Sequence, residues 1–118
     1  MKYLLMIFEN EQQWASVSAA ERQGIYAEYG TLIQSIVQSG HYVAGHQLQP
    51  TSTATTVRVR DGKPLFTDGP FAETREQLGG FFLVEANDLD EATAIAARIP
   101  SARTGSIEVR PVMPPEMR

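Results

Sequence analysis

The 118-residue chain contains no cysteine, and this absence removes several classes of protein chemistry. Without cysteine there is no disulfide, no thiolate nucleophile and no cysteine-ligated zinc site. Any catalysis would therefore have to use oxygen or nitrogen groups.

A basic stripe is also missing, because the ten Lys and Arg residues are scattered and the formal net charge is −4. The electrostatic attraction that drives binding to a phosphate backbone is consequently weak. We expect no nucleic acid partner. The chain also lacks a G-x-x-x-x-G-K-[ST] phosphate loop and any internal repeat.

Long hydrophobic runs are absent too. The first apolar run, residues 3–8, is shorter than the h-region of a signal peptide, and no later run approaches the length of a membrane span. We therefore expect a cytoplasmic protein with no membrane partner. With 42% apolar residues the chain fits one domain, residues 1–112, followed by a flexible tail, residues 113–118.

The residues that are present predict two helices with recognisable ends. Ser18 followed by Glu21 forms a capping box, an apolar stripe continues at helical spacing, and Gly40 is placed to end the helix. Asp88 with Glu91 repeats the capping box, and Pro100 prevents continuation of the second helix.

Strand patterns surround these helices. Residues 3–8 and 81–84 are apolar on both faces, residues 41–49 and 106–112 read as further strands, and Asp61-Gly62 predicts a hairpin between two short extended pieces. The order β-α-β, hairpin, β-α-β predicts an α+β fold of ferredoxin type, a split β-α-β sheet with a hairpin extension. The two doubly apolar strands should form its central pair, and residues 106–112 an edge.

Two helices can cover only one face of such a sheet. The other face would leave large apolar side chains of both central strands exposed, as in a protein–protein interface. A second copy of the chain is the simplest cover, so we expect a homodimer.

The candidate acid–base pair is His46 with Asp68. Strand alternation places His46 on the same face as Tyr42, half-buried, where it could act as a general base, and Asp68 heads a turn that returns toward the sheet. The alternative for His46 is a structural, hydrogen-bonded histidine. The alternative for Asp68 is an Asx-type turn before Gly69-Pro70. Tyr42 is a candidate substrate contact, although the pattern favours a packing role for it.

The charged bridge between this turn and the next strand also has two interpretations. Glu73 and Arg75 could form a short solvated turn. Alternatively, Arg75 could bind an acidic ligand or pair with Glu73 at the mouth of a cleft, with Gly79-Gly80 allowing close backbone approach. No residue set has the spacing of a metal site, and we expect no cofactor.

The stretch "TDGPFAETREQLGGFFLVEA", residues 67–86, resembles the signature of the DGPF branch of the YCII-related proteins. "MKYLLMIF", "AGHQLQP", "DLDEATAIAARIP" and "GSIEVRPV" are similar to the family pattern as well, so the resemblance covers nearly the whole chain. It implies a ferredoxin-type domain that dimerises through its sheets as an α+β barrel.

For function, the resemblance implies two alternatives. Some wider relatives use a His–Asp pair, including a dehydrochlorinase-like activity on aromatic ring metabolites, which suggests binding of a small metabolite with proton transfer or elimination. Their histidine lies in the first helix region, where this chain has none, so His46 and Asp68 are a local candidate pair. DGPF relatives also occur with extracytoplasmic-function sigma factors, which suggests a non-catalytic sensing or regulatory module.

Overall fold

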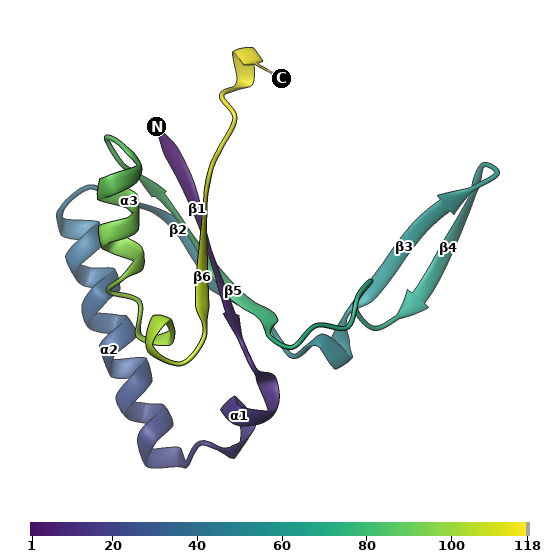
Figure 1. The fold of residues 1–118 in the computed structure, drawn as a ribbon, viewed down its shortest axis with the longest axis horizontal. Coiled ribbons are helices and arrows are strands. Elements are labelled where there is room, and N and C mark those ends of the chain that lie inside the picture. Colours follow the sequence, from purple (N-terminus) through teal and green to yellow (C-terminus); the bar gives the residue numbers. More distant parts are fainter. Residues whose placement is uncertain (118) are drawn as a thin grey trace.

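The computed structural model describes residues 1–117, whose body is a four-stranded antiparallel sheet with helices on one face (Figure 1). The elements in chain order are β1 (Lys2–Glu9), α1 (Glu11–Ser16), α2 (Ala19–Gln38), β2 (Tyr42–Gln47), β3 (Thr55–Arg60), β4 (Lys63–Asp68), β5 (Gln77–Glu85), α3 (Leu89–Ala96) and β6 (Ser106–Pro111). Short 3₁₀ turns follow β2, α3 and β6 as η1 (Thr51–Thr53), η2 (Pro100–Arg103) and η3 (Pro115–Met117).

The strand order in the body is β2-β5-β1-β6, with β1 and β5 in the centre and every pair antiparallel. This is the order of a split β-α-β sheet, so the predicted α+β ferredoxin-like fold is confirmed. The prediction that residues 106–112 form an edge strand is confirmed as well, since β6 pairs with β1 alone.

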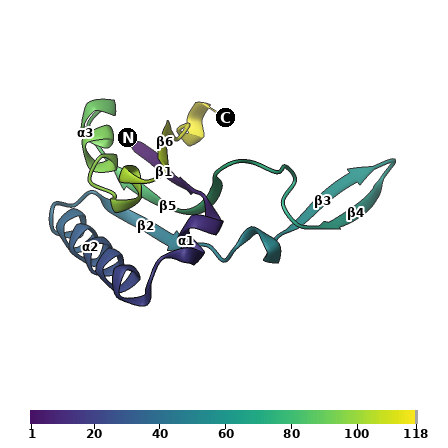
Figure 2. The same ribbon diagram turned by 60° about the horizontal axis from the view of Figure 1, so that its bottom comes forward.

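The hydrophobic core lies between the sheet and helices α2 and α3, which cover the same face (Figure 2). Alternate residues of β1 and β5 point into it because side chains of a strand alternate between its two faces. Fully burying one such side chain contributes roughly 1.5–3 kcal/mol. The buried core residues are Tyr3, Leu5, Ile7, Leu32, Ile36, Phe82, Val84, Ala86, Ala92, Ile95, Ala96 and Ile99.

Both predicted helix starts are confirmed by their caps. The Ser18 hydroxyl accepts a hydrogen bond from the Glu21 amide at 3.1 Å, and the Asp88 carboxylate accepts one from the Glu91 amide at 2.9 Å. Each bond satisfies an amide that the first helical turn leaves without an intrahelical partner. Gly40, with φ +81°, follows the first of these helices in the left-handed conformation that glycine adopts most easily.

The predicted hairpin is also confirmed, but it forms a sheet of its own. Asp61 and Gly62 both have positive φ, 52° and 74°, as a two-residue type I′ turn requires. β3 and β4 pair only with each other and project away from the body (Figure 1).

The second face of the main sheet carries no helix. Its apolar residues on the central strands, Leu4, Met6, Phe81 and Leu83, are half-buried in the single copy. The helices cover one face only, as expected, and the cover of the other face by a second copy of the chain stays a prediction.

The predicted flexible tail contains η3, and its last residue, Arg118, lies outside the described residues. Within residues 1–117, no helix has both the length and the apolar character needed to cross a membrane.

Candidate functional site

A groove of about 640 Å³ lies between α1, α2 and the ends of β2 and β5. Helix α1 forms one wall because the Asn10 side chain accepts a hydrogen bond from the Gln13 amide at 3.1 Å and starts the helix. The sequence interpretation missed this helix, although Asn10 followed by Gln13 at the third helical position is a capping pattern. It places Trp14 in the groove, where its ring meets Tyr26 edge to face at 5.8 Å.

The floor of the groove depends on two glycines. Phe82 lies over Gly45, whose side chain, if it had one, would meet the ring at 2.5 Å. A Cβ atom on Gly80 would meet the carbonyl oxygen of His46 at 2.9 Å. The predicted close backbone approach at the Gly79-Gly80 pair is thus observed at Gly80, where it brings strands β2 and β5 together.

The Tyr29 hydroxyl is a partly buried polar group of the groove. It shares a 2.5 Å hydrogen bond with the Ser101 hydroxyl, and Ser101 is 6% exposed. Burial raises the pKa of Tyr29 above its ordinary value of 10.0, and the negative charge of Glu9 raises it further. The Tyr29 hydroxyl therefore keeps its proton at neutral pH and offers a ligand a neutral hydrogen-bonding group.

The mouth of the groove carries acidic side chains. Glu11 accepts hydrogen bonds from the backbone amide and the hydroxyl of Thr51, at 2.7 and 2.8 Å, and so fastens the segment after β2 to α1. Glu9 also lines the groove, whereas Lys and Arg are absent from its lining within residues 1–117. The charged side chains that line the groove itself are therefore acidic, while the Arg22 guanidinium lies behind the lining, 5.1 Å from the Trp14 ring centroid.

His46 lines this groove, but not in the predicted orientation. β2 contains a bulge at Val43, so Tyr42 pairs with Val84 on the helix face while His46 pairs with Phe81 on the open face. The prediction that His46 shares a face with Tyr42 is wrong because the extra residue shifts the alternation. His46 is exposed rather than half-buried, and its ring lies 5.9 Å from that of Phe81.

Asp68 does not lie with His46. It is exposed at the end of β4, on the projecting hairpin, and within residues 1–117 its carboxylate accepts no hydrogen bond and forms no ion pair. The turn after it is held instead by the backbone, since the Gly69 amide donates to the Ala54 carbonyl at 2.7 Å. The structure gives no support to a His46–Asp68 pair.

The other predicted site residues are dispersed. Tyr42 packs edge to face on Phe82 at 6.3 Å and does not line the groove. Arg75 lines a separate polar recess of about 320 Å³, and Glu73 is exposed outside both hollows. Within residues 1–117, neither the Glu73 side chain nor the Arg75 side chain forms a hydrogen bond or an ion pair.

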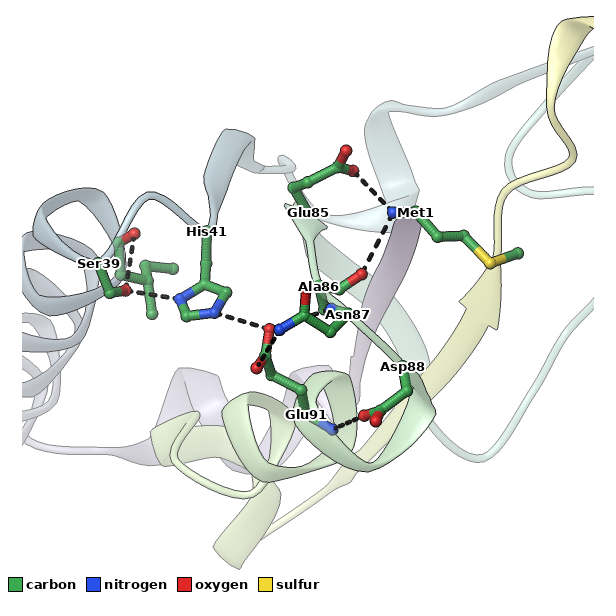
Figure 3. A network of polar contacts seen from close by, with 9 residues as sticks. Met1, Ser39, His41, Glu85, Ala86, Asn87, Asp88 and Glu91 are labelled. Carbon is green, nitrogen blue, oxygen red and sulfur yellow. Dashed lines mark hydrogen bonds and ion pairs between the residues drawn. The ribbon is translucent and has the colours of Figure 1, made fainter.

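A second polar cluster joins the end of α2 to the start of α3 (Figure 3). His41 Nε2 lies 2.9 Å from Glu91 Oε1, and His41 Nδ1 lies 2.6 Å from the Ser39 hydroxyl. The Asn87 amide and His41 hydrogen-bond the Glu91 carboxylate and lower its pKa below the ordinary value of 4.5. This cluster ties the two helices together on a surface away from the groove, which indicates an architectural role.

No metal site emerges from the side chains of residues 1–117, where no three His, Asp or Glu residues converge. The chemistry of the groove is that of aromatic rings, carboxylates and the hydroxyls of Tyr26, Tyr29 and Ser101.

Comparison with known proteins identifies relatives of the chain. The model of the YCII-related domain matches residues 1–116. The chain belongs to the YCII-related family. This YCII-related chain is also 35% identical over 114 residues to the uncharacterized protein R00369 of Rhizobium meliloti (strain 1021), across 95% of this chain and 92% of that protein. The resemblance stated from the sequence is confirmed for the family, and its DGPF branch stays a prediction.

Proposed function

We propose that this YCII-related domain binds a small, neutral, hydroxylated aromatic metabolite in the groove between α1 and α2. The observation that carries the proposal is the lining, which combines aromatic rings with a protonated tyrosine hydroxyl and acidic side chains. The volume of about 640 Å³ falls within the range of small-molecule sites.

The aromatic rings supply most of the binding energy in this proposal. Trp14 and Tyr26 meet edge to face, and Tyr29 and Phe82 lie 6.2 Å apart, so a planar ring can pack between the two pairs. The Tyr29 hydroxyl can exchange a hydrogen bond with a ligand hydroxyl. The Ser101 hydroxyl already satisfies one hydrogen bond of this group, and a phenolic O–H both donates and accepts, so a ligand hydroxyl can add a second bond.

The charge of the lining selects against anions. A carboxylate ligand would approach Glu9 and Glu11 without meeting a Lys or Arg side chain among the described lining residues. Bringing like charges together in a partly desolvated site is unfavourable. Neutral phenols therefore fit the groove better than aromatic carboxylates of the same size.

A titration with matched probes tests the proposal. Trp14 is the single tryptophan of the chain and lines the groove, so its fluorescence reports directly on occupancy. We expect 4-methylphenol to quench it saturably and to bind at least fivefold more tightly than 4-methylbenzoate. Equal or tighter binding of the carboxylate, or no saturable binding of either probe, would contradict the proposal.

The proposal stops at binding, because Asp68 lies outside the groove and leaves His46 without the carboxylate expected for proton transfer. The same groove would serve as the sensing site if the chain acts as a regulatory module of a sigma factor, the other role implied by the resemblance.

We further propose that the chain is a homodimer joined across the open face of the main sheet. Leu4, Met6, Phe81 and Leu83 form a contiguous apolar surface there, left without a helix by the fold. Sedimentation equilibrium at tens of micromolar should give twice the chain mass of 13.0 kDa. A single-chain mass at that concentration would refute the dimer.

A further inference from the structure

The β3–β4 hairpin, residues 55–68, stands apart from the rest of the molecule and is called the arm below. Its two strands pair only with each other, and both views show it extending away from the body (Figures 1 and 2). The radius of gyration is 16.3 Å, against about 13.5 Å for a compact chain of this length. The arm therefore packs on little of its own chain.

The two faces of the arm differ in chemistry. Directly opposed residues of an antiparallel pair share a face, so Val57 with Phe66 and Val59 with Pro64 form one apolar face. Val57, Phe66 and Val59 are 55%, 69% and 60% exposed.

The opposite face of the arm is mainly basic. Arg58 pairs with Leu65, and Arg60 pairs with Lys63. Three of the ten Lys and Arg residues of the chain thus lie within a few residues of one another on one side of the arm.

The arm is fixed at its root but uncovered along its length. Gly69 is held on both sides, since its amide donates to the Ala54 carbonyl at 2.7 Å and its carbonyl accepts from the Thr56 hydroxyl at 2.8 Å. A two-stranded hairpin in water is marginally stable unless its apolar face packs on something. A fixed, apolar ribbon that points away from its own core is suited to contact another molecule.

The distribution of charge between the arm and the rest of the chain indicates the binding partner of the arm. Three basic residues, Arg58, Arg60 and Lys63, and two acidic ones, Asp61 and Asp68, leave the arm with a formal charge of +1. The rest of the chain then carries a formal charge of −5, which together with the +1 of the arm gives the net charge of −4. A basic arm on an acidic body is complementary to the body of another copy of the same chain.

We propose that the arm packs its apolar face on the body of a second copy, so that the two arms of a dimer each clasp the opposite protomer. This inference rests on the proposed homodimer and adds a second contact to the sheet-to-sheet interface. The two-fold symmetry of a homodimer repeats every such contact, so each arm residue contributes two contacts per dimer. The long Arg and Lys side chains can bend around the narrow ribbon to reach acidic groups of that protomer.

Hydrogen exchange on the full-length chain, followed by mass spectrometry, tests the contact directly. At a concentration where sedimentation shows the dimer, amides of residues 55–68 should exchange at least tenfold more slowly than after dilution to monomer. Fast exchange of the arm in a proven dimer would overturn the clasp while leaving the sheet interface standing. A chain that stays monomeric would overturn both.

Matched substitutions on the two faces give an independent readout. Phe66→Thr removes the largest apolar side chain from the proposed contact face and keeps a residue suited to a strand. Leu65→Thr makes a similar change on the other face and is the control. We expect the dissociation constant of the dimer to rise at least tenfold for Phe66→Thr and less than threefold for Leu65→Thr; equal effects would contradict the assignment of faces.

The same exchange experiment distinguishes two other binding partners of the arm, a DNA duplex and an anionic membrane surface. If the arm of the dilute monomer became protected on adding a DNA duplex or vesicles of anionic phospholipid, its partner would be that surface and the proposal would be overturned. The low number of basic residues and the negative net charge argue against either.

Discussion

Replacing Gly30 by Phe should weaken the binding of 4-methylphenol more than tenfold while leaving the fold intact. Gly30 lines the groove from α2, and a Cβ atom built on it meets nothing within 4 Å. A phenyl side chain growing from this open position would therefore occupy space proposed for the ligand. Removing a glycine from a helix interior should also raise the free energy of unfolding by a few tenths of a kcal/mol.

Gly24→Phe is the matched control for this prediction. Gly24 lies in the same helix, has equally open surroundings and does not line the groove. We expect it to bind the phenol like the unmodified chain and to show a similar change in stability. If both variants bound normally, the groove would not be the binding site; if both lost binding, the loss would not report on the groove.

Gly105→Ala should be the most destabilising of the glycine-to-alanine changes in this chain. A Cβ atom on Gly105 would meet the Phe8 backbone carbonyl oxygen at well under 3.0 Å. A backbone atom of a central strand cannot move away easily, so the turn between η2 and β6 would have to shift and disturb the β1–β6 pairing at Phe8 and Ser106. We expect a loss of about 1–3 kcal/mol in the free energy of unfolding, as overpacking in a tight site typically causes.

Urea unfolding of Gly105→Ala and Gly79→Ala measures this effect against a control. Gly79 also lies in the main sheet, but its added Cβ would meet only the Ile7 carbonyl oxygen, at 3.9 Å. Gly79→Ala should therefore stay within about 0.5 kcal/mol of the parent chain, as most substitutions without a clash do. Unchanged stability of Gly105→Ala would show that the approach to Phe8 is not a real constraint.

The fold was predictable because its signals are local and agree with one another. Ser18 and Asp88 mark helix starts, Asp61-Gly62 fixes a hairpin turn, and the doubly apolar strands β1 and β5 occupy the centre of the sheet. Each of these signals depends on residues close in the chain. The separation of the hairpin from the main sheet depends on long-range packing, which no local pattern specifies.

The candidate site was harder to predict for the same reason. One bulged residue in β2, Val43, was enough to move His46 to the face opposite Tyr42, and strand alternation gives no warning of a bulge. The Tyr29–Ser101 hydrogen bond joins residues 72 positions apart, and each residue alone reads as ordinary packing or loop. Of the residues predicted for the site, His46 alone lines the groove.

The central claim, that the groove between α1 and α2 holds a neutral phenol, is tested most directly by an amide NMR titration of the ¹⁵N-labelled chain with 4-methylphenol. We predict saturable shifts of the Trp14 indole N–H and of the backbone amides of Gly30, Gly45 and Ser101, which line the groove, with the signals of the β3–β4 hairpin and of the His41–Glu91 cluster unmoved. Saturable shifts confined to residues outside the groove, or none at millimolar probe, would contradict the claim.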